Sequence, residues 1–126
     1  MPISSKIRLA TLGSSNQRAV LIRDSNKLVS MAVIKSPGIR ESEVLQYSKY
    51  RSLPEEALRY MATKRDWIKY YPVKLNLVQN TRCPIEYALR FLAHLRPPDL
   101  RSVERDRNVP QAIARAAKQL REKRTK

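Results

Sequence analysis

The chain has 126 residues, of which 26 are lysine or arginine and 11 are aspartate or glutamate, so its formal net charge is +15. Apolar residues make up 42% of the chain, which is enough for one folded domain with a core and excludes a chain that is disordered throughout. The sequence has no run of about 18 apolar residues and no secretory core at its amino terminus, and its single cysteine, Cys83, has no disulfide partner. We therefore expect a cytoplasmic protein without a membrane span.

In chain order, apolar residues recur at helical spacing, and strand alternation is almost absent. The apolar stripes fall at residues 7–12, 19–22, 28–34, 44–47, 57–61, 73–78, 88–95, 100–103 and 113–120. The residues expected to begin the first three helices are Ser4 or Ser5, Asn16 and Asn26. Gly13 and Pro37 are expected to end helices. Helices this short are marginal alone, so we expect each one to be stabilised by its neighbours.

The chain also repeats itself. RSLPEEALRYMA at residues 51–62 returns, with small changes, as TRCPIEYALRFLAHL at residues 81–95. Both copies place a glutamate two residues after a proline, and looser copies of the proline-marked start occur around Pro37 and Pro110. Self-similarity at this spacing is typical of proteins built from stacked helical units.

Residues 73–110, VKLNLVQNTRCPIEYALRFLAHLRPPDLRSVERDRNVP, resemble the leucine-rich repeat variant and HEAT-like class of α-solenoids. Units of that class read as a short helix, an Asn-x-x-x-Pro joint and a second helix. The strings KIRLATLG, LIRDSNKL and KSP in the first part of the chain are similar to small bacterial helical-repeat proteins. The resemblance implies a fold rather than an activity, and the spacing between the prolines is irregular.

From the pattern and the resemblance together, we expect an all-α fold: a short, right-handed α-solenoid of about eight or nine short helices. One helical-repeat domain is expected at residues 1–120, followed by a basic tail at residues 121–126.

Little in the sequence predicts catalysis. His94 and Cys83 are single representatives of their types, so we expect no metal site, and two glycines cannot form a phosphate-binding loop. HEAT-like alkylpurine DNA glycosylases use an aspartate with tryptophans on a concave face, and Asp66-Trp67 is the only such combination in a chain that is short for that architecture. We therefore expect a non-enzymatic protein without a cofactor.

The positive charge is spread along the whole chain, which favours a nucleic-acid partner, DNA or RNA, contacted through its phosphate backbone. The alternative is a scaffold whose basic groove binds an acidic segment of a protein partner or a ribonucleoprotein assembly. The candidate nucleic-acid-binding residues are Lys64, Arg65, Trp67, Lys69, Tyr70, Tyr71, Arg101, Arg105, Arg107, Arg115 and Lys118.

The sharpest of these candidates lie in KRDWIKYYP, residues 64–72, where cations alternate with aromatic residues. Aromatic rings can stack on unpaired bases while neighbouring cations bind phosphates. The alternative interpretation is that Trp67 packs between helices, whereas Tyr70 and Tyr71, next to a proline, are the better candidates for exposure.

Overall fold

The computed structural model describes residues 1–124, and the regular structure in that part of the chain is entirely helical. Its ten helices are α1 (Ile3–Leu12), α2 (Ser15–Leu21), α3 (Lys27–Ile34), α4 (Glu41–Tyr47), α5 (Glu55–Thr63), α6 (Arg65–Ile68), α7 (Tyr71–Gln79), α8 (Ile85–Leu92), α9 (Pro97–Arg105) and α10 (Gln111–Arg124). The all-α prediction is confirmed. The additional helix is α6, a single turn that has too few residues to show an apolar stripe.

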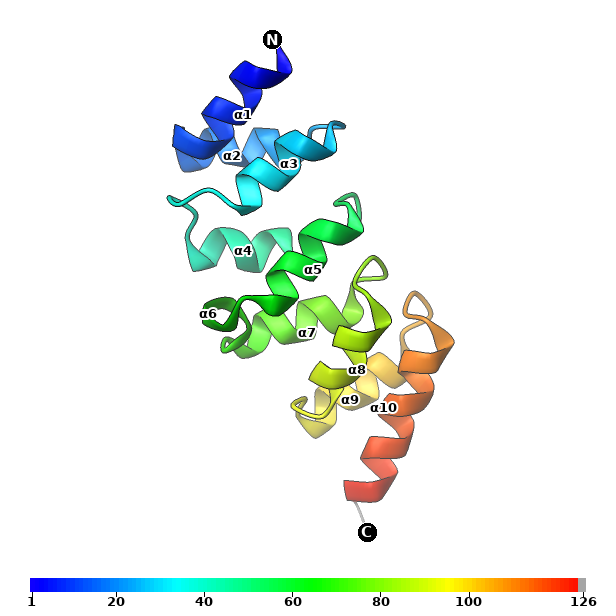
Figure 1. The fold of residues 1–126 in the computed structure, drawn as a ribbon. Helices are drawn as coiled ribbons and strands as arrows, with labels where there is room; N and C mark the ends of the chain where they lie inside the picture. The colour runs from blue at the N-terminus through cyan, green and yellow to red at the C-terminus, as the bar shows by residue number, and fades with distance from the viewer. Residues whose placement is uncertain (125–126) are drawn as a thin grey trace.

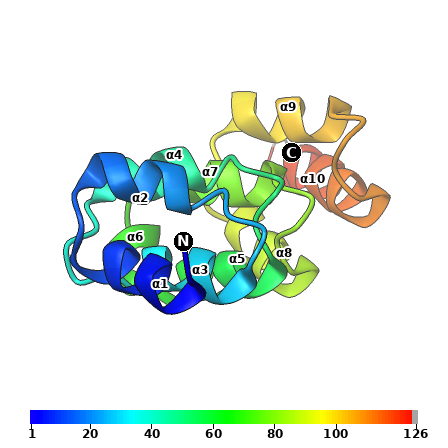
Figure 2. The ribbon, with the colours of Figure 1, turned by 90° about the horizontal axis from the view of Figure 1, so that it is seen from above.

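The helices are arranged in two rows along an elongated molecule, with α1 and α10 at opposite ends (Figures 1 and 2). One row contains α1, α3, α5 and α8, and the other contains α2, α4, α7 and α9, while α10 packs against α8 and α9. Buried apolar side chains from both rows form one continuous core that runs from Ala10 to Ala117. Each short helix is therefore stabilised by its neighbours in the stack.

The helix starts correct two of the expected caps. α1 begins directly after Pro2, whose fixed φ suits a helix entrance and whose carbonyl accepts from the Lys6 amide at 3.1 Å, so neither Ser4 nor Ser5 is the cap. α2 is capped by Ser14 rather than Asn16, because Gln17 stands where its side chain can complete a capping box. Asn26 caps α3 as predicted.

Three loops that lead into α5, α8 and α10 share one pattern, and we call them the joints. They span residues 50–54, 80–84 and 106–110, and each consists of a two-residue turn, a buried side chain and a proline. The buried side chains are Leu53, Cys83 and Val109. The carbonyl of each proline accepts a hydrogen bond from an amide in the first turn of the next helix. The sequence predicts Pro37, Pro54, Pro84 and Pro110 at helix starts or in the loops before them, and this is confirmed: Pro37 lies in the loop before α4, and the other three directly precede helices.

The glutamate that follows each of the first two joint prolines connects neighbouring helices. Glu56 of α5 pairs with Lys27 of α3 at 2.6 Å, and Glu86 of α8 pairs with Arg59 of α5 at 3.1 Å. All four side chains are about half exposed, so each pair contributes at most about 1 kcal/mol. The repeated glutamate therefore contributes mainly to the alignment of successive helices in the row.

In the other row, hydrogen bonds connect Asn76 of α7 and Asn80, the residue that ends α7, to the end of α4 and the residues that follow it. The amide of Asn80 donates to the carbonyls of Ser48 (2.9 Å) and Tyr50 (3.1 Å), and its side-chain oxygen accepts from the Arg82 amide. Asn76 donates to the carbonyl of Leu45 and to the Ser48 hydroxyl. These bonds fix the joint at residues 80–84 relative to the joint at residues 50–54.

We expect Asn80→Ala to lower the free energy of unfolding by about 2–3 kcal/mol, because it leaves carbonyls at the end of α4 without donors. Urea denaturation measures this loss. Asn108→Ala, in the exposed part of another joint, is the control and should cost less than about 1 kcal/mol. An equal loss in both variants would contradict this role of the amide.

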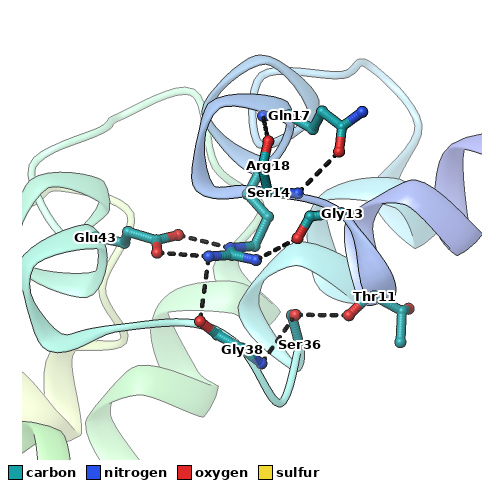
Figure 3. Close-up of polar contacts among 8 residues, drawn as sticks. All are labelled: Thr11, Gly13, Ser14, Gln17, Arg18, Ser36, Gly38 and Glu43. Carbon is teal, nitrogen blue, oxygen red and sulfur yellow. Dashed lines mark hydrogen bonds and ion pairs between the residues drawn. The ribbon is translucent and has the colours of Figure 1, made fainter.

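A buried ion pair holds α2 against α4 (Figure 3). The Arg18 side chain is 4% exposed, and its Nε and Nη2 atoms donate to the two carboxylate oxygens of Glu43, both at 2.7 Å. The same guanidinium donates to the carbonyls of Gly13 and Gly38. Arg18 therefore bonds to the loop after α1, the loop after α3 and helix α4, and the Arg18 guanidinium holds the pKa of the Glu43 carboxyl below its usual range.

At the carboxyl-terminal end, the last turn of α10 is part of the packed structure. Arg121 pairs with Glu104 of α9 at 2.7 Å, and Arg124 donates to the carbonyls of Leu95 and Ala93. Of the basic tail expected at residues 121–126, residues 121–124 thus continue α10, and residues 125–126 lie outside the described part of the chain.

Within residues 1–124, none of the helices has the length and apolar character needed to cross a membrane.

Candidate nucleic-acid interface

Ion pairs neutralise much of the negative charge of the described chain and little of the positive charge. The six pairs are Lys6–Asp24, Arg18–Glu43, Lys27–Glu56, Arg59–Glu55, Arg59–Glu86 and Arg121–Glu104. Within residues 1–124, these six pairs involve six carboxylates but only five of the 25 lysines and arginines. The surface outside these pairs is therefore strongly positive.

The predicted segment at residues 64–72 places its tryptophan inside the protein. Trp67 is 8% exposed, and its ring meets the ring of Tyr60 in an edge contact with centroids 5.8 Å apart. Lys64 lies over the rings of both residues, at 5.5 Å from Trp67 and 5.7 Å from Tyr60. Trp67 therefore packs between helices, which was the alternative interpretation of this residue.

Tyr71 is half-buried rather than exposed, because α7 begins with it against the start of α9. Its hydroxyl donates to the Asp99 carboxylate and accepts from the Arg96 amide at 2.8 Å. The Arg96 guanidinium lies 4.3 Å from the centre of the ring. Burial is the main cause that raises the pKa of Tyr71, and the Asp99 carboxylate adds to it. The side chain therefore connects two helices of one row.

Tyr70 is 41% exposed, as expected for this residue. Lys69 lies 5.4 Å from the centre of its ring, and Lys69, Lys64 and Arg65 are all exposed. These three cations surround α6, on the side of the molecule opposite the joints (Figures 1 and 2).

The other predicted residues lie at the carboxyl-terminal end of the stack. Arg101 and Arg105 are exposed on α9, Arg107 is exposed in the last joint, and Arg115 and Lys118 are exposed on α10. The pKa of Glu104 is lowered mainly by its bond to Arg121, with smaller effects from Lys118 and Arg105. The structure thus divides the predicted residues into two groups, one around α6 and one on α9, α10 and the joint between them.

A third set of cations lies in the joints. Arg51, Arg82 and Arg107 each occupy the two-residue turn of a joint, and all three side chains are exposed. We call them the joint arginines. The ion pairs and ring contacts within residues 1–124 do not include any of the three. The three joints follow one another along a single edge of the molecule (Figures 1 and 2).

The first joint arginine borders a shallow polar hollow. Arg51 of the joint at residues 50–54 and Lys49 just before it line one side, and Asn76 and Gln79 of α7 with Asn80 of the next joint line the other. The side-chain N–H groups of Asn76 and Asn80 already donate to groups at the end of α4, so the two cations are the donors that match the acceptor oxygens of a phosphate or carboxylate group.

Sequence reasoning missed Arg51 and Arg82, although a signal was present. When the copies are aligned on their prolines, an arginine precedes each proline by two or three residues, in Arg51-Ser-Leu-Pro54, Arg82-Cys-Pro84 and Arg107-Asn-Val-Pro110. The aromatic residues at residues 64–72 gave the stronger pattern, and two of the three aromatic side chains there pack against the protein itself.

Cys83 and His94 occupy unlike positions. Burial raises the pKa of the Cys83 thiol to about 12, so the side chain is a protonated thiol at neutral pH. His94 is exposed just after α8. Among residues 1–124, no three His, Cys, Asp or Glu side chains gather in a way that could hold a metal ion.

The fold and the surface charge together define the class of protein: an all-α protein of short helices in two rows, with a positively charged surface. No family model, curated protein or solved structure matches the chain.

Proposed function

We propose that this chain is a non-enzymatic α-solenoid that binds nucleic acid through its phosphate backbone. The observation that carries the proposal is the set of joint arginines: Arg51, Arg82 and Arg107 are exposed and unpaired within the described residues, and their joints follow one another along one edge of the molecule. The three equivalent joints each carry one cation in the same turn. Positive charges that recur along one edge are complementary to a polymer that carries a negative charge in each unit.

Counterion release supplies the free energy of binding. Each phosphate that a lysine or arginine neutralises releases condensed counterions, and this term is independent of base sequence. The guanidinium group also matches phosphate geometry, because it can donate two parallel hydrogen bonds. The other exposed cations, around α6 and on α9 and α10, add to the attraction at longer range.

The alternative is an acidic segment of a protein partner. Arg51 and Lys49 offer hydrogen-bond donors in the hollow that they line, and a carboxylate can accept hydrogen bonds from them just as a phosphate can. Carboxylates of a flexible peptide have a lower and less regular charge density than a nucleic acid backbone, so the row of joint arginines favours the phosphate polymer.

We expect the slope of log affinity against log salt to be about −3 to −5, as for four to six phosphate contacts. Raising the salt concentration from about 50 to 200 mM should then weaken binding by roughly 10² to 10³. Fluorescence anisotropy with labelled DNA and RNA measures the affinity at each salt concentration. An acidic polypeptide at matched salt is the control, and equal affinity for it would reduce the proposal to general charge attraction.

A further inference from the structure

We infer that the nucleic acid recognised by this protein is a duplex rather than a single strand, an inference that rests on the proposed function. Proteins that bind single strands combine a basic groove with aromatic side chains on which unpaired bases stack. The state of the aromatic rings therefore distinguishes the two kinds of ligand.

Three of the eight aromatic side chains are buried in the core. Trp67, Phe91 and Tyr47 are 8%, 3% and 2% exposed. Their rings pack between helices, so a base could reach them only if the helices separated.

The half-buried tyrosines carry cations of the chain itself on their rings. Arg23 lies 4.4 Å from the ring centre of Tyr50, and Arg96 lies 4.3 Å from that of Tyr71. Cations at these distances from a ring centre are attracted to its face. A base that stacked on this face of either ring would have to displace a guanidinium group.

Tyr60 and Tyr87 have the same kind of neighbours at longer distances. The neighbours are Lys35 at 5.5 Å and Lys64 at 5.7 Å for Tyr60, and Arg90 at 5.4 Å and Arg59 at 5.9 Å for Tyr87. Tyr70 is thus the one aromatic side chain in the described chain that is more than about a third exposed, and Lys69 lies against its ring as well. A single ring on the side opposite the joint arginines does not form a stacking platform.

The edge of joints also suits a stiff ligand. Hydrogen bonds from Asn80 fix two of the joints relative to each other, and each joint has a buried side chain that anchors it. A rigid row of cations fits a stiff polyanion with little ordering cost, whereas a flexible single strand loses conformational entropy when it follows such a row. Duplex DNA also carries one charge per about 1.7 Å of axis, against about 3.4 Å for one strand.

The expected size of the preference follows from the salt slopes. They are about −0.9 per contact for duplex DNA and about −0.7 for a single strand, so five contacts give slopes that differ by about one. If the two ligands bind equally at 1 M salt, the duplex binds about tenfold more tightly at 0.1 M.

The test is an anisotropy titration of the full chain at 0.1 M salt with a DNA duplex, an RNA duplex and the corresponding single strands. The two duplex arms identify which duplex is preferred. Tyr70→Ala and Arg82→Gln are titrated with the same ligands. We expect both duplexes or one of them to bind about tenfold more tightly than either strand, and Tyr70→Ala to change no affinity by more than about twofold. Arg82→Gln should weaken duplex binding by about eightfold, as the loss of one contact predicts.

Three outcomes have different consequences. Tighter binding of a single strand, or a loss of fivefold or more for Tyr70→Ala on single strands alone, would show base stacking and overturn the inference while the proposed function stands. Tighter duplex binding together with an unchanged Tyr70→Ala variant would support the inference. Binding of none of the four ligands would reject the proposed function itself.

Discussion

Glu43→Ala is expected to lower the free energy of unfolding by about 3–5 kcal/mol, the largest effect on stability that we predict. The substitution leaves the Arg18 guanidinium buried with two carbonyls and no counter-charge. Urea denaturation monitored by circular dichroism measures the change. The double variant Arg18→Met, Glu43→Leu removes both charges and should recover part of the loss, because it leaves no ion buried alone.

Glu41→Ala is the matched control, because Glu41 is an exposed glutamate on the same helix. It should cost less than about 1 kcal/mol, from its favourable position in the first turn. If Glu43→Ala costs no more than Glu41→Ala, the pair does not stabilise the fold as described.

The same pair predicts a dependence of stability on pH. The pKa of Glu43 is lowered in the folded protein, mainly by its bond to Arg18, so the unfolded chain binds the proton more readily. The stabilisation is complete above the ordinary pKa of a glutamate and is lost as the pH falls through the lower, folded value. The Glu43→Gln variant has no carboxyl group at this position, so its free energy of unfolding should fall less steeply in acid than that of the parent chain.

The triple variant Arg51→Gln, Arg82→Gln, Arg107→Gln should show the largest effect on binding. The salt slope should lose about three units, one for each phosphate contact removed. At 0.1 M salt this corresponds to an affinity loss of roughly 10² to 10³. The three side chains are exposed, so thermal stability should stay close to that of the parent chain.

Lys64→Gln, Arg65→Gln, Lys69→Gln is the control with the same change in charge, around α6. We expect it to reduce the slope by less than one unit, because these cations lie on the opposite side from the joints. Equal losses in the two triple variants would mean that the whole surface attracts the ligand diffusely, without a preferred edge.

Much of the helical fold could be predicted, because each apolar stripe lies where a helix forms and each joint proline precedes one. Local signals decided these elements, as at Asn26, whose side chain caps α3. α6 was missed because one turn is too short for a periodic pattern. The pair Arg18–Glu43 was missed because the sequence alone does not show whether a charged residue is buried. The available signal was that Arg18 lies on the same helix face as the buried Leu21 and Ile22. The solenoid itself stays a prediction.

The candidate interface was harder to predict than the fold. Exposure depends on which helices pack together, and no local pattern states that Tyr71 will meet Asp99 of a helix two elements later. The group on α9 and α10 was found from charge alone. The joint arginines required the copies to be aligned on their prolines and then placed on one edge, and only the structure supplies that placement.

The burial of Cys83 gives the protein a chemical reporter of its own motion. The thiolate is the form of cysteine that attacks an alkylating reagent, and with a pKa of about 12 in its buried position this side chain offers almost none. Its alkylation therefore proceeds through molecules in which the joint at residues 80–84 has opened, and the rate measures how often that opening occurs. A polyanion lying across the neighbouring Arg82 would hold the joint closed, so protection of one sulfur from alkylation would reveal where on the surface the ligand lies.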